Sequence, residues 1–189
     1  MIKLSFRDTI KATGDVHSWG CLMIEFPQEF CNEIQKWSNS NISDKVIYDN
    51  AEHEFGRETK SHATVAYGID PKKDPEDIQF LLYQWRKPVK VRLGKISKFD
   101  TKPEHDVIKI EVLSKDLHEM HEECDLQLGL PGNTFPNYIP HVTIAYVKPK
   151  SCDHLLGKEP FLGKEFMLSK FEYSYPNGKK DSKIHYNLN

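Results

Sequence analysis

The sequence predicts an α+β fold in which two similar lobes form one domain. Strand and helix patterns alternate about twice along the 189 residues, and no linker of domain-boundary character separates them. The hexapeptide at residues 62–67 also recurs, almost letter for letter, at residues 141–146. We therefore expect residues 1–189 to form a single domain, with one copy of the repeat in each lobe.

The first half of the chain shows two strand patterns, each followed by a helix pattern. Residues 21–26 are mostly apolar, and apolar side chains then recur at helical spacing over residues 30–37. Residues 62–67 form the second strand pattern. Asp74 is the expected N-cap of the next helix, with Pro75 at its first position.

The second half of the chain begins with an alternating segment at residues 89–93, which predicts a strand with one face in water. Gly94 interrupts the alternation and predicts a bulge. Ser114 is the expected N-cap of a later helix. The remaining predicted elements are a strand at 108–112, a loop at 127–140, a strand at 141–147 and a hairpin over 171–188 with its turn at 176–178.

Composition excludes some classes of protein. Charged residues make up 29% of the chain, but the formal net charge is only −2, which argues against a protein that coats long nucleic acid. No apolar run approaches the roughly 18 residues that span a bilayer, and the first residues lack the apolar centre of a secretory signal. We expect a cytoplasmic protein with no membrane partner.

The cysteines and histidines outside the repeat do not predict a metal site. The four cysteines are Cys21, Cys31, Cys124 and Cys152. They form no C-x-x-C pair, so buried thiols are expected. His118, His121 and Cys124 follow one another at steps of three, but Cys124 continues an apolar helical stripe and no second ligand pair accompanies them. We predict no metal and no cofactor.

The repeat carries two H-x-T motifs. With nine histidines in the chain, chance predicts about a third of one such motif. The period of two in a strand places His, Thr and Ala of each copy on one face. These residues are His62, Thr64 and Ala66 in the first copy and His141, Thr143 and Ala145 in the second. The same parity assigns Tyr67 and Tyr146 to the opposite, core-facing side.

Pairing the two lobes would gather two imidazoles and two hydroxyls around one cleft. One imidazole can act as general base and the other as general acid near neutral pH. Threonine hydroxyls can donate hydrogen bonds to phosphoryl oxygens as charge develops. This set suits phosphodiester cleavage without a metal. The near-symmetry of the repeat leaves open which histidine is the base.

Both motifs together resemble the signature of the 2H phosphoesterase superfamily, two H-x-[ST] motifs on facing strands. The resemblance implies a bilobal fold of two pseudo-symmetric antiparallel-sheet lobes, with helices outside and a central cleft. It also implies a metal-independent phosphodiesterase with catalytic and phosphate-binding roles for His62, Thr64, His141 and Thr143.

The lead-in Gly56-Arg57-Glu58 looks most like the phage anti-CBASS branch, whose members linearise cyclic oligonucleotide signals. That branch implies a small cyclic oligonucleotide as substrate, a role in viral counter-defence in the host cytoplasm, and no long nucleic acid as partner. Ser61 departs from the proline that many relatives have at this position, which the second motif retains as Pro140.

Several further residues are candidates for substrate binding. Arg57 and Glu58 are candidates from the lead-in, and His17, Trp19 and Tyr138 are candidate stacking rings in loop-like segments. One alternative function is RNA end-processing by a 2′,3′-cyclic phosphodiesterase, a 2′-5′ RNA ligase-like protein or a 2′,5′-oligoadenylate phosphodiesterase. The other is a nucleotide-binding sponge that cuts nothing.

Overall fold

A single antiparallel sheet organises the chain. The computed structural model describes residues 19–49, 55–100, 102–175 and 183–188. Its eight strands lie in the order β6-β3-β4-β5-β2-β1-β7-β8. They are β1 (Gly20–Glu25), β2 (His62–Ile69), β3 (Val89–Phe99), β4 (Asp106–Leu113), β5 (His141–Val147), β6 (Glu165–Leu168), β7 (Lys170–Ser174) and β8 (Lys183–Asn187).

The sheet consists of two four-stranded halves that meet at β2 and β5. We call β1, β2, β7 and β8 the first lobe, and β3, β4, β5 and β6 the second lobe. The lobes join through the antiparallel pair Ala63–Val142. Each H-x-T strand is thus the innermost strand of its lobe, so the expected α+β fold with two antiparallel lobes is confirmed.

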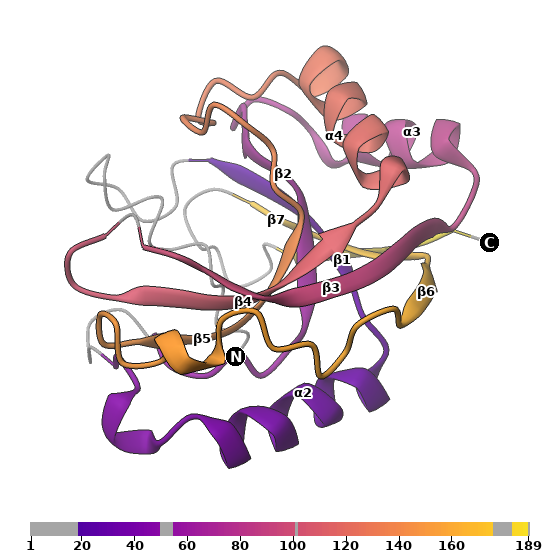
Figure 1. The fold of residues 1–189 in the computed structure, drawn as a ribbon. Helices are drawn as coiled ribbons and strands as arrows, with labels where there is room; N and C mark the ends of the chain where they lie inside the picture. Colours follow the sequence, from indigo (N-terminus) through magenta and orange to yellow (C-terminus); the bar gives the residue numbers. More distant parts are fainter. Residues whose placement is uncertain (1–18, 50–54, 101, 176–182, 189) are drawn as a thin grey trace.

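Helices cover the sheet at two places. The helices are α2 (Gln28–Asn41), α3 (Pro75–Trp85) and α4 (Lys115–Leu128), with short 3-10 turns at Asp44–Val46 and Asp153–Leu155. Figure 1 shows α3 and α4 side by side at the top of the view and α2 along the bottom. None of the helices in the described segments is both long and apolar enough to cross a membrane.

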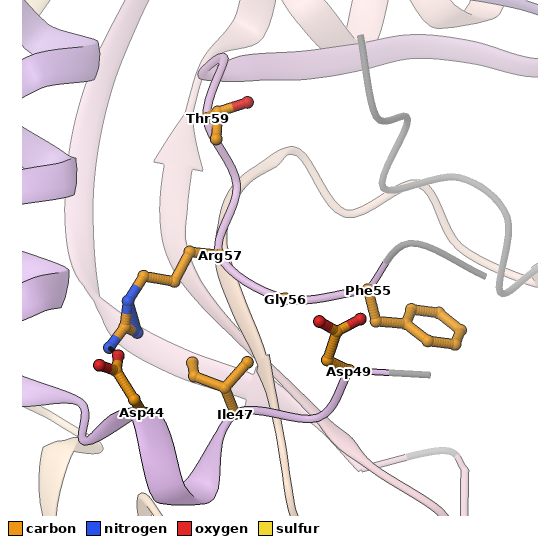
Figure 2. A pocket seen from close by; sticks show the side chains of 7 residues that line it. All are labelled: Asp44, Ile47, Asp49, Phe55, Gly56, Arg57 and Thr59. Carbon is orange, nitrogen blue, oxygen red and sulfur yellow. Dashed lines mark hydrogen bonds and ion pairs between the residues drawn. The ribbon is translucent and has the colours of Figure 1, made fainter. Parts of the chain in front are cut away.

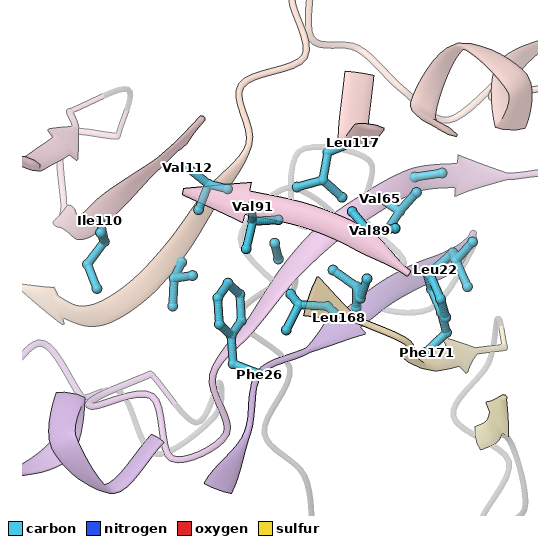
Figure 3. Packing of buried hydrophobic residues seen from close by; sticks show 14 of the residues in the cluster. Leu22, Phe26, Val65, Val89, Val91, Ile110, Val112, Leu117, Leu168 and Phe171 are labelled. Carbon is cyan, nitrogen blue, oxygen red and sulfur yellow. The ribbon is translucent and has the colours of Figure 1, made fainter. Parts of the chain in front are cut away.

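One hydrophobic core runs beneath both lobes. Figure 3 shows side chains of the two lobes meeting there, among them Leu22 and Val65 from the first and Val91 and Ile110 from the second. Apolar side chains of all three helices, such as Leu117, join the same cluster. We call this side of the sheet the core face and the opposite side the site face.

Most of the predicted elements are present. The Ser114 hydroxyl accepts a hydrogen bond from the Leu117 amide at 3.1 Å, which confirms the predicted cap. The bulge predicted at Gly94 is also confirmed, because the β3–β4 register shifts between Leu93 and Ile96. The expected hairpin pairs β7 with β8, and its turn at 176–178 lies outside the described residues. All four cysteines are buried thiols, as expected.

Two details differ from the prediction. β6 has no counterpart in the sequence analysis, because four residues with a mixed burial pattern are too short to show a clear period. Helix α4 extends to Leu128, so its last two residues, Gln127 and Leu128, lie within the segment predicted as a loop. Its C-cap is Gly129, at φ 69°.

Candidate active site

The two H-x-T motifs meet where the lobes join. Ala63 of β2 pairs with Val142 of β5. Because the strands are antiparallel, extending this register by one residue each way places each histidine across from the other motif's threonine. We call these residues the quartet: His62, Thr64, His141 and Thr143.

Both imidazoles are oriented by the same kind of hydrogen bond to the backbone. His62 Nδ1 lies 3.0 Å from the Lys60 carbonyl oxygen, and His141 Nδ1 lies 2.7 Å from the Ile139 carbonyl oxygen. A carbonyl oxygen can only accept, so each Nδ1 carries a proton and donates it. In the neutral ring, this leaves Nε2 as the nitrogen that accepts a proton.

A bulge in β2 changes which side chains share a face with the first motif. Met23 of β1 lies across from Thr64, but the next residue, Leu22, lies across from Ala66. Val65 is therefore an extra residue, and the alternation shifts by one beyond it. Tyr67 then lies across from Cys21, on the same face as Thr64.

The same bulge occurs in β5. Lys109 of β4 lies across from Thr143, and Ile108 lies across from Ala145, which makes Ile144 the extra residue. Tyr146 then lies on the face of Thr143. The bulge therefore belongs to both copies of the repeat.

These bulges overturn the predicted faces of the alanines and tyrosines. Ala66 and Ala145 are fully buried in the main core and do not border the histidines. Tyr67 belongs to a separate cluster with Cys21 and Met23, on the site face. Strand parity holds only for an uninterrupted strand, and neither H-x-T strand is uninterrupted.

The surroundings of His141 favour its neutral form. Burial lowers the pKa of His141 to about 4; the Ile139 carbonyl opposes this, and the nearby Lys109 and His62 add to it. The ring of Phe99 packs at right angles against His141, with 4.9 Å between centroids. A neutral imidazole with Nδ1 held by a carbonyl is suited to accept a proton at Nε2.

The sequence matches the model of the 2′-5′ RNA ligase superfamily over residues 26–159, a segment that contains both H-x-T strands. The chain belongs to this superfamily, the 2H phosphoesterases. The resemblance noted in the sequence is thereby confirmed at the level of the superfamily. Among curated proteins, no sequence matches the chain significantly.

Solved structures with this fold cover nearly the whole chain at low identity. A structure described as a phosphoesterase is 15% identical, covers 91% of this chain and 96% of its own, and has a TM-score of 0.56. Escherichia coli LigT complexed with NADP+ is 14% identical, with 92% and 95% coverage and a TM-score of 0.53. Kluyveromyces marxianus Usb1 with uridine monophosphate is 10% identical, with 91% and 99% coverage and a TM-score of 0.55.

The lead-in to the first motif has a structural role in this 2H fold. The Glu58 amide donates to the carbonyl of Ile144, the bulged residue of β5, at 2.9 Å. The Tyr146 amide donates to the Gly56 carbonyl at 2.9 Å. The lead-in therefore continues the sheet along β5 and holds its bulge.

Arg57 binds within the fold. Its Nη2 donates to Asp44 Oδ1 and to the Ile42 carbonyl, each at 2.6 Å. Figure 2 shows this guanidinium directed at Asp44, in a surface pocket. The pocket is lined by Asp44, Ile47, Asp49, Phe55, Gly56, Arg57 and Thr59. No member of the quartet lines this pocket, and Glu58 is buried beside β5.

The two stacking candidates within the described residues lie in different surroundings. Trp19 packs on Cys21, Met23 and Tyr67 on the site face, where its ring touches Gly132 so closely that a β-carbon there would lie 2.4 Å from it. Tyr138 stacks on His121, with 4.0 Å between centroids. His17 lies outside the described residues.

An ionic cluster borders His62 and was missed by the sequence analysis. Lys60 makes ion pairs with Glu25 and with the buried Glu172, the latter at 2.7 Å. Burial alone would lower the pKa of Lys60, but the hydrogen bonds to these carboxylates outweigh it and the net shift is upward. Glu25 lies across from His62 in the β1–β2 register. Long-range strand pairing builds this cluster, and no local motif marks it.

Among the described residues, the same cluster contains three potential ligand atoms that are close enough together to share a cation. One atom each of Glu25, Glu172 and His185 lie within 4.8 Å of one another. The Lys60 ammonium already binds both carboxylates, so a metal ion would have to displace it.

Proposed function

We propose that the chain is a metal-independent phosphodiesterase in which His62 and His141 are the acid–base pair. The observation that carries this proposal is the shared orientation of the two imidazoles, each with Nδ1 on the carbonyl two residues upstream. Two imidazoles held in this way can remove one proton and deliver another in one reaction.

The reaction follows from the quartet. A neutral imidazole takes the proton of an attacking 2′-hydroxyl or water at Nε2. The new P–O bond forms as the bond to the leaving oxygen breaks, and the protonated imidazole gives its proton to that oxygen. Hydroxyls of Thr64 and Thr143 donate to the non-bridging oxygens, where negative charge builds up.

A small cyclic oligonucleotide is the substrate we propose, and counter-defence against host signalling is the role. The net charge of −2 and the carboxylates of Glu25 and Glu172 beside the first motif disfavour a long polyanion. The Gly56-Arg57-Glu58 lead-in resembles the signal-degrading branch. Attack by a neighbouring 2′-hydroxyl also gains from proximity, because nucleophile and phosphorus belong to one molecule.

RNA end-processing is the second candidate. It is favoured by the superfamily description, which names 2′-5′ RNA ligases, and by the shared fold of Usb1, whose structure contains uridine monophosphate. Its substrate would be a 2′,3′-cyclic phosphate or a 2′-5′ linkage.

A substrate panel separates the two candidates. Purified protein is incubated with 3′,3′-cyclic diadenylate, cyclic triadenylate, 2′,3′-cyclic uridylate and 2′-5′ oligoadenylate, and products are separated by chromatography. We expect linear products from a ribose ring and none from its 2′-deoxy analogue. Opening of 2′,3′-cyclic uridylate without cleavage of either ring would assign the protein to RNA end-processing. Cleavage of the deoxy ring at a similar rate would identify water as the nucleophile.

A further inference from the structure

The two lobes match each other closely around the quartet, which makes their differences informative. Each threonine of the quartet lies across from one residue of the neighbouring strand, which is Met23 in β1 and Lys109 in β4. Each histidine lies across from a glutamate in the same two strands. The lobes therefore carry the same type of residue across from His but different types across from Thr: a thioether in the first and an ammonium in the second.

Lys109 is a buried cation: burial lowers its pKa, and the nearby Glu111 carboxylate opposes this shift. The residue is 4% exposed. Its Nζ donates to Ser97 Oγ at 2.7 Å and lies 4.4 Å from the centre of the Phe99 ring. Phe99 in turn touches His141 edge to face. The cation and the second histidine thus share one aromatic neighbour.

Three charged or titratable groups face His141 from the strands around it. Lys109 and Glu111 belong to β4, and His62 belongs to β2. The Glu111 carboxylate turns toward β3, where Oε2 lies 3.4 Å from the position that a β-carbon on Gly94 would take. Lys109 and His62 both oppose a positive charge on His141.

The first lobe has the opposite electrostatics. The residue next to Met23 in β7 is the buried Glu172, whereas the residue next to Lys109 in β3 is Ser97. With Glu25, Glu172 and Lys60 together, the charges beside His62 sum to −1 when all three are ionised. Negative surroundings favour a protonated imidazole.

We propose, on the basis of the phosphodiesterase function above, that Lys109 is a positioning residue that makes the two histidines unequal: its ammonium keeps His141 as the neutral base, and His62 is the acid. In the reaction, His141 Nε2 takes the proton of the nucleophile. His62 then gives its proton to the leaving oxygen as the P–O bond to that oxygen breaks. A bound phosphodiester, being an anion, raises the pKa of His141 from its low value in the free protein toward the working pH.

The first test replaces Lys109 with the residue found at the matching position of the other lobe. In Lys109→Met, we expect the NMR titration of the His141 ring to move up by roughly one pH unit, and the acid limb of kcat/KM to move with it. Lys109→Arg keeps the charge, so we expect the His141 titration and the acid limb of kcat/KM to stay at their wild-type pH values. Lys109→Gln is a second neutral variant, to be used if Lys109→Met does not fold. It retains a side-chain donor for Ser97, and we expect the same upward shift of the His141 titration.

The second test assigns acid and base directly. Whichever panel member is cleaved is prepared with sulfur in place of the leaving oxygen, because a thiolate departs without a proton donor. We expect this substrate to restore most of the activity lost in His62→Ala and none of that lost in His141→Ala.

These outcomes separate the inference from the proposed function. An unmoved His141 titration in both neutral Lys109 variants, or rescue of His141→Ala by the sulfur substrate, would overturn the inference and leave the phosphodiesterase intact. A wild-type protein that cleaves no panel member would overturn the function and the acid–base roles with it. The NMR titration would still decide whether Lys109 acts on His141.

Discussion

The Tyr138 hydroxyl donates a 2.6 Å hydrogen bond to the backbone carbonyl of Thr64. Beside it, His121 Nδ1 lies 2.8 Å from the carbonyl of Val65, the extra residue of the β2 bulge. The two rings stack with 4° between their planes. A loop residue and a residue of α4 therefore hold the strand segment that presents the first H-x-T motif.

Replacing Tyr138 with phenylalanine tests this support. The Thr64 carbonyl loses its donor, so we expect the free energy of unfolding to fall by about 0.5–1.5 kcal/mol. Turnover should fall with little change in KM, because the ring that would stack on a base remains. Urea unfolding measures the free energy of unfolding, and steady-state kinetics measure turnover and KM. Tyr83→Phe, at an exposed position of α3, is the matched control. A raised KM with unchanged stability would instead identify the hydroxyl as a substrate contact.

Each histidine of the quartet should be essential for turnover. We expect His62→Ala and His141→Ala to lower kcat by on the order of 10²–10⁴-fold, the usual contribution of a positioned acid or base. Affinity for the substrate should fall much less, since the threonines remain. His154→Ala, at an exposed position of a 3-10 turn, should behave as wild type. Near-normal turnover of either quartet variant would refute the two-histidine mechanism.

Activity should survive treatment with EDTA. The quartet supplies every proton transfer and hydrogen bond of the proposed reaction, and Lys60 occupies the carboxylates of Glu25 and Glu172. The assay compares turnover before and after chelation and dialysis. Loss of activity that one divalent ion restores would contradict the prediction. In that case, Glu25, Glu172 and His185 would be the candidate ligands of the ion.

The neutral state of His141 should make stability depend on pH. Its pKa is lowered to about 4 in the folded chain, against about 6.5 in the unfolded chain. The unfolded state therefore binds more protons between these values, and stability falls as pH decreases from 6.5 toward 4. We expect wild type to lose on the order of 1 kcal/mol more than His141→Gln between pH 7 and pH 5. Urea midpoints at the two pH values measure this difference, and equal losses would refute it.

Much of the fold could be predicted because its signals are local. Ser114 caps its helix, Gly94 marks the bulge of β3, and the two H-x-T strands occur where their β-branched and apolar residues indicate. The fold class follows from the alternation of such segments. β6 was missed because its pairing with β3, rather than its own four residues, defines it.

The candidate site could be predicted only in part. His and Thr of each motif are two apart and precede the bulge, so period two places them correctly. Tyr67 and Tyr146 follow the bulge, and parity therefore assigned them to the wrong face. Arg57 was a candidate because it belongs to the Gly56-Arg57-Glu58 lead-in, but its guanidinium binds Asp44, a partner that no local spacing indicates.

The sequence by itself determined the two H-x-T strands, the helices that follow the strand patterns, and the resemblance to the superfamily. Residue type and spacing along a single strand or helix carry that information. Only the tertiary structure decided what lies across from each motif. The extra residues Val65 and Ile144 shift the register, and cross-strand pairing then brings Lys109 beside Thr143 and Met23 beside Thr64. These neighbours come from strands that are distant in sequence, and the balance of charge between the two histidines depends on them.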